Sequence, residues 1–272
     1  MPQIRIQDDF SLEKIADSGQ CFRCRQAEDG AWVFITGRHM LRIRSVKENV
    51  FDVSCDRSTW DRVWHPYFDL DRNYARIRSD ACGLFSYLDH ALDTGAGLRI
   101  LRQDPWEMLI TFILSQRRSI PVIRRSVQLI CEAFGEKSES HIRFPSPEAL
   151  AQAGDEPLRQ CCLGYRAPYV RKTAAMISQG IMPPVFPDSL STPELLDALM
   201  TFPGVGRKVA NCVALFGYGR MDAAPVDTWI ARVIEEDFGG KAPFDTFPET
   251  AGIIQQYLFY TKRADSREHP AS

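Results

Sequence analysis

A lysine and an aspartate in the C-terminal part of the sequence have the types and positions that covalent catalysis needs. Lys208 directly follows a Gly-rich turn and opens an apolar-periodic segment, so it lies at the N-terminus of a predicted helix. A neutral amine at such a position can act as a nucleophile and form a Schiff base. Asp227 precedes the periodic residues Ile230 and Val233, where a carboxylate caps a helix or stabilises a developing positive charge. The simpler alternatives are a solvated surface lysine and an N-cap alone.

The turn before Lys208 joins two predicted helices. The first helix follows Ser191 and has Pro193 and Glu194 in its first turn, and the Pro-Gly-Val-Gly segment 203–206 comes after it. Glycine lets a backbone approach a ligand closely, and the unpaired N–H groups at a helix N-terminus suit a phosphate oxygen. Such contacts hold a DNA backbone without reading its sequence. The alternative is a plain helix–helix corner, in which glycine only ends the first helix.

The charged residues are unevenly distributed, although the net charge is only −2. Three stretches contain arginine or lysine and no acidic residue: 108–131, 157–187 and 203–221. Such segregation predicts a localised surface for a polyanion. Solvated helix faces would give the same pattern, so charge alone leaves both interpretations open.

Composition excludes several classes of protein. The 272 residues are 44% hydrophobic and 25% charged, which is typical of a globular protein and not of a disordered or collagen-like chain. No apolar run approaches the ~20 residues of a membrane helix, and the N-terminus lacks a secretion signal. We therefore expect no membrane partner and a protein that stays inside the cell with its eight cysteines reduced. Cys21 and Cys24 form a lone C-x-x-C pair, which supplies only half of the usual zinc ligands.

Two kinds of pattern divide the chain. Up to about residue 75, short apolar and polar stretches alternate, as in 32–35, 41–44 and 49–53, which predicts an antiparallel sheet. From about Ser58 onward apolar residues recur at helical spacing, and a Pro-rich link at 181–187 interrupts them. The sequence therefore predicts an α+β protein, mainly α, in which a β-containing N-terminal part precedes a helical body.

The residues around the Gly-rich turn resemble a known family. Segment 202–208, followed by 225–227, is similar to the helix-hairpin-helix (HhH-GPD) superfamily of DNA glycosylases, and more narrowly to the 8-oxoguanine DNA glycosylases. Five further blocks match in the same order: 18–23, 67–71, 103–107, 163–167 and 255–259. Their order and their spread over most of the chain argue against a chance similarity.

The resemblance implies a two-lobed helical glycosylase body after the sheet. We place the N-terminal antiparallel β-sheet domain, with its helices, at residues 1–98 and the HhH-GPD catalytic body at 99–272, with the hairpin at about 193–217. The sequence stops soon after Phe259, which points to a compact bacterial-type member. Such a protein would be cytoplasmic, at the nucleoid, or nuclear if the organism is a eukaryote.

The chemistry of this family assigns a role to each catalytic candidate. By resemblance, Lys208 attacks C1′ of the damaged nucleotide, expels 8-oxoguanine and leaves a Schiff base that undergoes β-elimination. Asp227 remains ionised and stabilises oxocarbenium-like charge on the sugar. The resemblance thus implies a base-excision-repair DNA glycosylase with lyase activity. The alternatives are a monofunctional alkylpurine glycosylase, which needs no lysine nucleophile, and a non-catalytic DNA-binding protein.

Four residues match the family's positions around the base, which must leave the DNA stack before it can react. Phe259 stacks on the base, and Gln255, one helical turn earlier, reads its Watson–Crick edge. The carbonyl of Gly19 accepts the N7–H that 8-oxoguanine has and guanine lacks, and Cys212 lies against the base. For Phe259 and Cys212 the alternative is ordinary core packing.

Contacts with the DNA duplex follow from the same resemblance. Seven residues match DNA-contacting positions: Arg117, Tyr165, Arg166, Gly204, Val205, Gly206 and Trp229. The hairpin residues would hold phosphate, Arg117 and Tyr165 would fill the space that the base leaves, and Arg166 would read the opposite cytosine. Trp229 replaces a histidine near the 5′ phosphate, and Val122 stands where animal-type members have another cytosine-reading arginine. We therefore expect weaker selectivity for cytosine opposite the lesion.

No cofactor is expected. Iron–sulfur members of the superfamily carry four cysteines after the catalytic aspartate, and no cysteine follows Cys212 in this sequence. No metal bound by side chains is expected, but a monovalent or divalent cation on the hairpin carbonyls of Met200, Phe202 and Val205 stays open. The expected partner is double-stranded DNA containing 8-oxoguanine, bound by a monomer.

Overall fold

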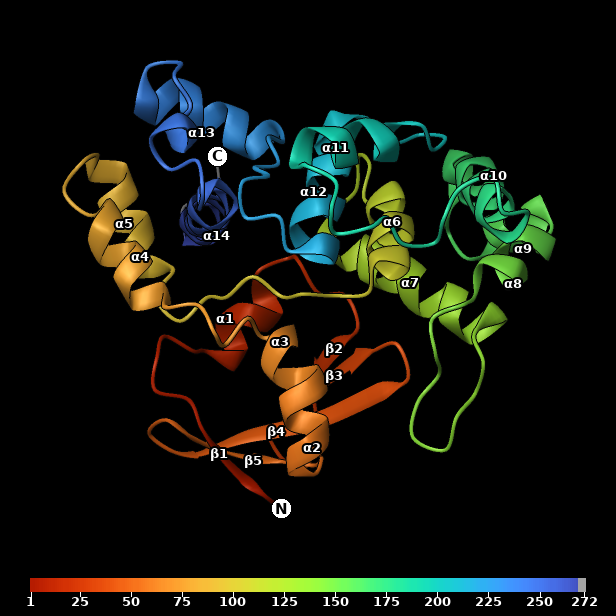
Figure 1. Cartoon of the computed structure of the whole chain (residues 1–272), viewed down its shortest axis with the longest axis horizontal. Helices are drawn as coiled ribbons and strands as arrows, with labels where there is room; N and C mark the ends of the chain where they lie inside the picture. The colour runs from red at the N-terminus through yellow and green to blue at the C-terminus, as the bar shows by residue number, and fades with distance from the viewer. Residues whose placement is uncertain (269–272) are drawn as a thin grey trace. The chain divides into compact units, whose positions relative to one another are not determined.

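The computed structural model describes residues 1–268, and Figure 1 shows their course from the N-terminal sheet to the C-terminal helix. Five strands form one antiparallel sheet in the order β1-β5-β4-β3-β2. They are β1 (Gln3–Arg5), β2 (Cys24–Gln26), β3 (Trp32–Thr36), β4 (His39–Lys47) and β5 (Val50–Val53). The predicted N-terminal antiparallel sheet is confirmed.

The strands follow the alternation of their side chains. In β4, Leu41 and Ile43 are fully buried, whereas Arg42 and Arg44 are partly or fully exposed. Because successive side chains of a strand point to opposite faces, this pattern gives the sheet one apolar face. Gly30, with φ +81°, supplies the left-handed backbone of the turn between β2 and β3.

Helices make up most of the remaining chain. Those before residue 135 are α1 (Leu12–Asp17), α2 (Arg57–Thr59), η1 (Trp60–Trp64), α3 (His65–Tyr67), α4 (Tyr74–Ala81), α5 (Ser86–Thr94), α6 (Pro105–Leu114) and α7 (Ile120–Phe134). Those after it are α8 (Pro147–Gln152), α9 (Asp155–Gln160), η2 (Gly164–Arg166), α10 (Ala167–Ser178), α11 (Thr192–Met200), α12 (Arg207–Tyr218), α13 (Thr228–Phe238), η3 (Pro243–Thr246) and α14 (Ala251–Glu268). The predicted α+β class with mainly helical structure is confirmed.

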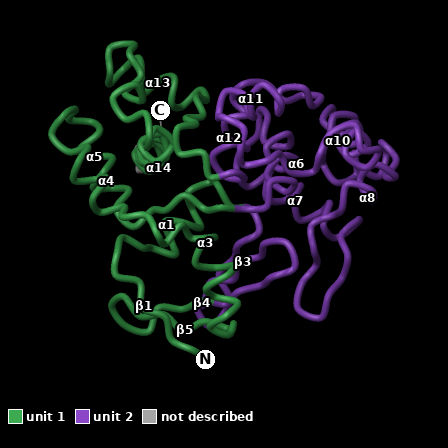
Figure 2. The backbone as a smooth tube through the Cα atoms, in the orientation of Figure 1, with its two compact units in different colours: residues 1–21, 43–102, 219–272 green, residues 22–42, 103–218 purple. Residues whose placement is uncertain are grey.

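The chain folds into two compact units, which Figure 2 shows in different colours. Unit 1 consists of Met1–Cys21, Ile43–Arg102 and Gly219–Ser272. Unit 2 consists of Phe22–Arg42 and Gln103–Tyr218. The units therefore alternate along the sequence, since β2 and β3 belong with the helices of unit 2. The boundary expected between residues 98 and 99 divides the chain once into two continuous domains, whereas each compact unit consists of separate segments. The expected boundary therefore stays a prediction.

The core of unit 2 is built around α6. Asp104 begins this helix by accepting the N–H of Glu107 at 2.8 Å, and every residue of α6 after Pro105 is buried. Helix α12 packs along α6, where the rings of Phe112 and Phe216 stack with their centroids 5.5 Å apart. A fully buried helix is held by contacts on all sides, so α6 forms a firm support for α12.

One carboxyl group of α6 is buried with a single charged partner. Glu107 lies 3.2 Å from Arg23, and both side chains are almost fully buried. Burial raises the pKa of the Glu107 carboxyl to about 7, although the positive charge of Arg23 acts in the opposite direction. The pair joins the chain just before β2 to the first turn of α6.

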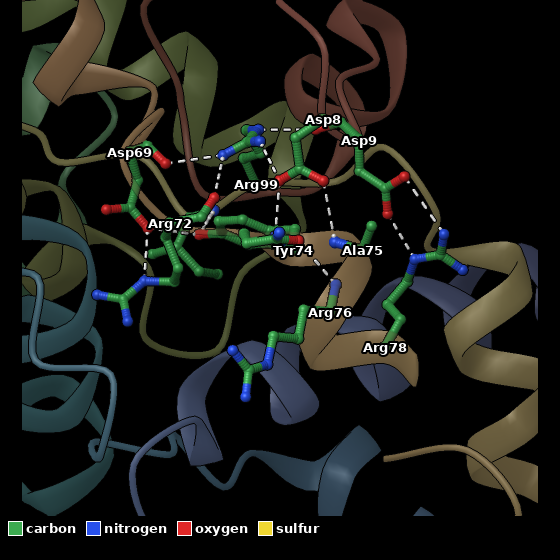
Figure 3. Close-up of polar contacts among 11 residues, drawn as sticks. Asp8, Asp9, Asp69, Arg72, Tyr74, Ala75, Arg76, Arg78 and Arg99 are labelled. Atoms are coloured by element: carbon green, nitrogen blue, oxygen red, sulfur yellow. Dashed lines mark hydrogen bonds and ion pairs between the residues drawn. The ribbon is translucent and has the colours of Figure 1, made fainter. Parts of the chain in front are cut away.

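A buried arginine organises unit 1 (Figure 3). Arg99 donates hydrogen bonds to the main-chain carbonyls of Asp9 and Asp69, each at 2.7 Å, and to Asp8 Oδ2 at 2.7 Å. Its guanidinium lies 4.5 Å from the ring centroid of Tyr74, the first residue of α4. Because a buried charge is tolerated only when it is paired and hydrogen-bonded, these contacts tie the segment before α1 to α4.

Candidate active site

The hairpin that carries Lys208 is defined by its backbone. Helix α11 begins with a capping box, in which Ser191 and Glu194 cap each other's backbone N–H groups. In the turn after α11, Gly204 has φ +77°, and a Cβ atom at this position would lie 2.5 Å from Tyr169 Cδ2. The first helical hydrogen bond of α12 runs from the N–H of Ala210 to the Gly206 carbonyl. The N–H groups of residues 207–209, which come before Ala210, therefore have no acceptor within the helix. The sequence correctly located this helix-turn-helix.

Lys208 lies in the first turn of α12 and is half-buried. Its ammonium nitrogen is 5.7 Å from the ring centroid of Phe112, a residue of the buried helix α6. Within unit 2, no carboxylate lies within ion-pair distance of this ammonium group. Cys212 follows one helical turn later and is buried. The amine is thus set against an aromatic face and is not held by an acid of its own unit.

The loop between α6 and α7 brings three segments of unit 2 together at Gln116. The side chain of Gln116 donates a hydrogen bond to the Gly204 carbonyl at 3.0 Å, and its main-chain carbonyl accepts from Arg166. The next residue, Arg117, is exposed and has φ +51°. A non-glycine residue in the left-handed region costs on the order of 1–3 kcal/mol, and such strain is frequent at functional sites. The loop therefore presents Arg117 beside the hairpin.

Two of the expected DNA-contacting residues differ sharply in exposure. Tyr165 is 54% exposed, whereas Arg166 is 5% exposed. The guanidinium carbon of Arg166 lies 4.2 Å from the centroid of the Tyr165 ring. Burial, and then the charge of Arg118, lower the pKa of the Arg166 guanidinium. In this structure Arg166 holds the backbone at Gln116, and its expected contact with cytosine stays a prediction. Val122, at the other expected cytosine position, is 44% exposed and has no hydrogen-bonding side chain.

Asp227 belongs to unit 1 and caps α13. Its Oδ1 atom accepts the backbone N–H groups of Trp229 at 3.0 Å and Ile230 at 2.9 Å. Among the described residues, no donor is bonded to Oδ2. Trp229 is 37% exposed at the start of the same helix. Both interpretations made from the sequence are compatible with this geometry, since one oxygen caps the helix and the other remains available.

Helix α14 carries the two residues expected to recognise a base. It packs against α5 and α13 within unit 1. Gln255 is 3% exposed, and its Oε1 atom is buried without a hydrogen-bond partner among residues 1–268. Phe259 is half-buried one turn later, with the Arg263 guanidinium 5.5 Å from its ring centroid. A buried amide oxygen without a partner is costly in a folded protein, and a donor from a ligand would satisfy it. The base-reading role of Gln255 stays a prediction.

Gly19 lies in the loop after α1 and has φ +82°. Its neighbours are both anchored: Gln256 donates to the Ser18 carbonyl at 2.9 Å, and Gln20 donates to the Arg99 carbonyl at 2.8 Å. The described residues form no hydrogen bond with the carbonyl of Gly19 itself. The sequence pointed to Gly19 but not to Gln20 or Gln256. The only signal for these two residues was that each is a polar glutamine within an otherwise buried stretch.

The described residues contain neither a metal-binding cluster of side chains nor a membrane-spanning helix. Between residues 1 and 268, no group of three or more His, Cys, Asp or Glu side chains could hold a metal ion. None of the eight cysteines, all of which lie within the described range, forms a disulfide bond, and Cys21 and Cys24 are both buried. No helix in this range combines the length and the apolar character that crossing a membrane requires.

Comparison with known proteins identifies the class to which this fold and these residues belong. A model of the HhH-GPD superfamily of base excision DNA repair proteins matches residues 110–251, and a model of the 8-oxoguanine DNA glycosylase N-terminal domain matches residues 3–109. The chain therefore belongs to the HhH-GPD superfamily. Its N-terminal match and its relatives place it, more narrowly, with the 8-oxoguanine glycosylases, which confirms the resemblance found in the sequence.

Three relatives show how far the similarity extends. A probable N-glycosylase/DNA lyase of Methanothermobacter thermautotrophicus is 32% identical over 92% of this chain and 93% of its own. The N-glycosylase/DNA lyase of Saccharomyces cerevisiae is 32% identical over 73% of this chain and 52% of its own. The 8-oxoguanine glycosylase/lyase of Clostridium acetobutylicum, solved with double-stranded DNA containing cytosine opposite 8-oxoG, has a TM-score of 0.89 and 31% identity and covers 97% of this chain and 95% of its own.

Proposed function

We propose that this chain removes 8-oxoguanine from DNA as a base-excision-repair glycosylase and then cleaves the strand as an apurinic/apyrimidinic lyase. The observation that carries the proposal is Lys208, an amine at the first turn of the helix that follows a Gly-rich hairpin. The 8-oxoguanine glycosylase/lyase of Clostridium acetobutylicum shares the fold over nearly the whole chain and supports the substrate class.

The proposed reaction uses Lys208 as the nucleophile. The neutral amine attacks C1′ of the nucleotide, a C–N bond to the sugar forms, and the bond to the base breaks with its electron pair on the leaving purine, which takes up a proton. Opening of the sugar then gives a Schiff base, which makes the 2′ proton acidic. Loss of that proton expels the 3′ phosphate by β-elimination, which accounts for the lyase step.

Asp227 would stabilise the positive charge that develops on the sugar as the base leaves. Its Oδ1 atom accepts two backbone N–H groups, which holds the carboxylate in one orientation. Because Oδ2 has no donor among the described residues, it is the oxygen that can face the sugar.

Recognition of the base would use residues of unit 1. The carbonyl of Gly19 accepts N7–H from 8-oxoguanine and repels the unprotonated N7 of guanine. Gln255 reads the Watson–Crick edge through an amide whose oxygen has no partner within the described chain. Phe259 would stack on the ring, and Cys212 would lie against the base. One mismatched buried polar contact changes affinity by about 1–3 kcal/mol, so a single carbonyl can discriminate the two purines.

Binding to the duplex would use the hairpin and the exposed side chains near it. The hairpin residues Gly204, Val205 and Gly206 would lie at a phosphate, which the unpaired N–H groups in the first turn of α12 suit, and a DNA backbone can be held in this way without sequence readout. Arg117 and Tyr165 would occupy the space left by the extruded nucleotide. We propose that the protein acts as a monomer. We also propose that it holds no iron–sulfur cluster, because no cysteine follows Cys212 in the sequence. The protein would act at the nucleoid or, in a eukaryote, in the nucleus.

Borohydride trapping tests the proposed chemistry. The protein is incubated with duplex DNA containing 8-oxoguanine opposite cytosine in the presence of borohydride, which reduces a Schiff base to a stable covalent link. We expect the wild-type protein and Lys241→Gln, a substitution of an exposed lysine, to be trapped, and Lys208→Gln not to be trapped. Base release without trapping would instead indicate a monofunctional glycosylase, and binding without release would indicate a non-catalytic DNA-binding protein.

A further inference from the structure

Helix α14 is joined to the Gly19 loop by a buried hydrogen bond. The side-chain nitrogen of Gln256 donates to the main-chain carbonyl of Ser18 at 2.9 Å, and the two residues are 238 positions apart in sequence. Gln256 is 2% exposed and Ser18 is fully buried. Gln256 directly follows Gln255, so the bond is made from the same turn of α14 that carries the base-reading residue.

The other side of Gly19 is fixed as firmly. Gln20 is fully buried, accepts the backbone N–H of Leu101 at 2.7 Å and donates to the hydroxyl of Ser18 at 2.9 Å. The Ser18 hydroxyl in turn donates to the Ile15 carbonyl at 2.7 Å, at the end of α1. Gly19 therefore lies between Ser18 and Gln20, whose polar groups are hydrogen-bonded to α1, to α14 and to the segment before α6.

These bonds decide where the carbonyl of Gly19 points. A glycine at φ +82° has few conformational limits of its own, so the direction of its carbonyl depends on its anchored neighbours. The carbonyls of Ser18 and Gly19 are adjacent, and among residues 1–268 the first accepts a hydrogen bond from Gln256, whereas the second accepts none. The second remains free to accept a donor from a ligand.

We propose that Gln256 is a positioning residue that sets the selectivity for oxidised guanine by fixing the Gly19 carbonyl relative to Gln255. This inference rests on the proposed function, in which Gly19 reads N7–H and Gln255 reads the Watson–Crick edge. The two contacts lie on different edges of one purine, so their separation must match the base. The hydrogen bond from Gln256 to Ser18 sets that separation, because it links the two reading elements directly.

The test separates base selectivity from the chemistry that follows base loss. Gln256→Leu removes the donor and keeps an apolar side chain of similar length. In a Lys208→Gln background, the dissociation constants for duplexes with 8-oxoguanine or guanine opposite cytosine are compared. We expect the ratio of the two constants to fall by about tenfold, because one buried hydrogen bond that anchors the loop is lost. With Lys208 intact, trapping on a duplex with a preformed abasic site should change by less than about twofold, since no base is read there.

Matched variants make the outcome decisive. Arg267→Ala removes a different contact between α14 and the end of α1, the ion pair with Asp17 at 2.7 Å, and should leave the ratio unchanged. If Gln256→Leu does not fold, Gln256→Glu keeps the size and polarity of the side chain. Its ionised carboxylate cannot donate, so the ratio should be low at about pH 8 and should rise toward the wild-type value as the pH is lowered and protonation of the carboxyl group restores a donor.

An unchanged ratio in the Gln256 variants, or a loss of abasic-site trapping as large as the loss of selectivity, would overturn the positioning role. The second result would mean that Gln256 only holds the fold together. A wild-type protein that does not release 8-oxoguanine would instead overturn the proposed function, so the two failures are distinguishable.

Discussion

The two side chains proposed to react have different surroundings. Lys208 is half-buried against the face of Phe112 and has no carboxylate partner within unit 2. Asp227 accepts two backbone N–H groups at the start of α13, which fixes the orientation of its carboxylate. The proposed reaction requires one amine and one carboxylate, and these two side chains supply them.

Replacing Asp227 by Asn separates its two roles. Asparagine caps helices about as well as aspartate, so the thermal unfolding midpoint should hardly change. The variant loses the negative charge opposite the developing oxocarbenium ion, and we expect the single-turnover rate of 8-oxoguanine release to fall by about 100-fold or more. A rate close to that of the wild type would mean that Asp227 serves only as the cap of α13.

At the residue level, the sequence was informative where a motif is local. Lys208 and Asp227 stand next to short patterns, a Gly-rich turn and a helix start, which can be recognised without the fold. Gln256 could not be recognised in this way, because glutamine is usually a surface residue and its partner Ser18 is remote in sequence. Arg166 shows the converse, since a basic residue in an acid-free stretch is almost completely buried.

Among the elements, the hairpin between α11 and α12 depends on one glycine more than on the other. Gly204 has φ +77° and lies against the Tyr169 ring, whereas a Cβ atom at Gly206 would meet no atom within 4 Å. We expect Gly204→Ala to lower the free energy of unfolding by about 1–3 kcal/mol and Gly206→Ala to change it little. Chemical denaturation of the two variants measures this difference, and equal destabilisation would contradict it.

Helix α6 gives the protein a pH dependence through Glu107. Its pKa is raised to about 7 from an ordinary value of 4.5, so between these values the folded protein binds more protons than the unfolded chain. Stability from this group is therefore highest at low pH and falls as the pH rises through this window, by at most ~1.4 kcal/mol per pH unit.

The measurement is chemical denaturation at about pH 5 and about pH 7, the window between those two pKa values. The wild-type protein should lose more stability over this interval than Glu107→Gln, which cannot ionise. Glu139→Gln, a substitution of an exposed glutamate, should behave like the wild type. Parallel losses in all three proteins would show that Glu107 does not titrate in this range.

Element types were predictable because hydrophobic period is a local property. The alternating stretch at 41–44 became the centre of β4, which is longer than predicted at His39–Lys47. The helical period after Ser58 was also correct, although the structure breaks that region into the short elements α2, η1 and α3. Element ends depend on capping and on tertiary contacts, which explains why the boundaries were less accurate than the types.

For the whole molecule, the sequence did not reveal how the chain is shared between the two units. Segment Phe22–Arg42 belongs with the helices of unit 2, whereas the rest of β4, from Ile43, and β5 belong to unit 1. This assignment comes from long-range contacts such as Arg23 with Glu107, 84 residues apart. Composition and periodicity describe neighbours along the chain, so they carry no signal for such pairs.

The distribution of charge over the molecule makes a prediction about salt. Nearly all of the three acid-free stretches lie in unit 2, and there Arg117, Arg124 and Arg125 are exposed. If these residues neutralise DNA phosphates, affinity for a duplex should fall at least about tenfold between roughly 50 and 200 mM salt. Fluorescence anisotropy with labelled DNA measures this slope, and an affinity independent of salt would contradict a DNA-binding surface on unit 2.

The central claim is that Lys208 is the residue that becomes covalently attached to the sugar. After borohydride reduction of the wild-type protein on a duplex containing 8-oxoguanine, nuclease and protease digestion followed by mass spectrometry identifies the modified residue. We expect the sugar remnant on the peptide that contains Lys208. A remnant on another lysine or on the N-terminal amine, with Lys208 unmodified, would contradict the claim.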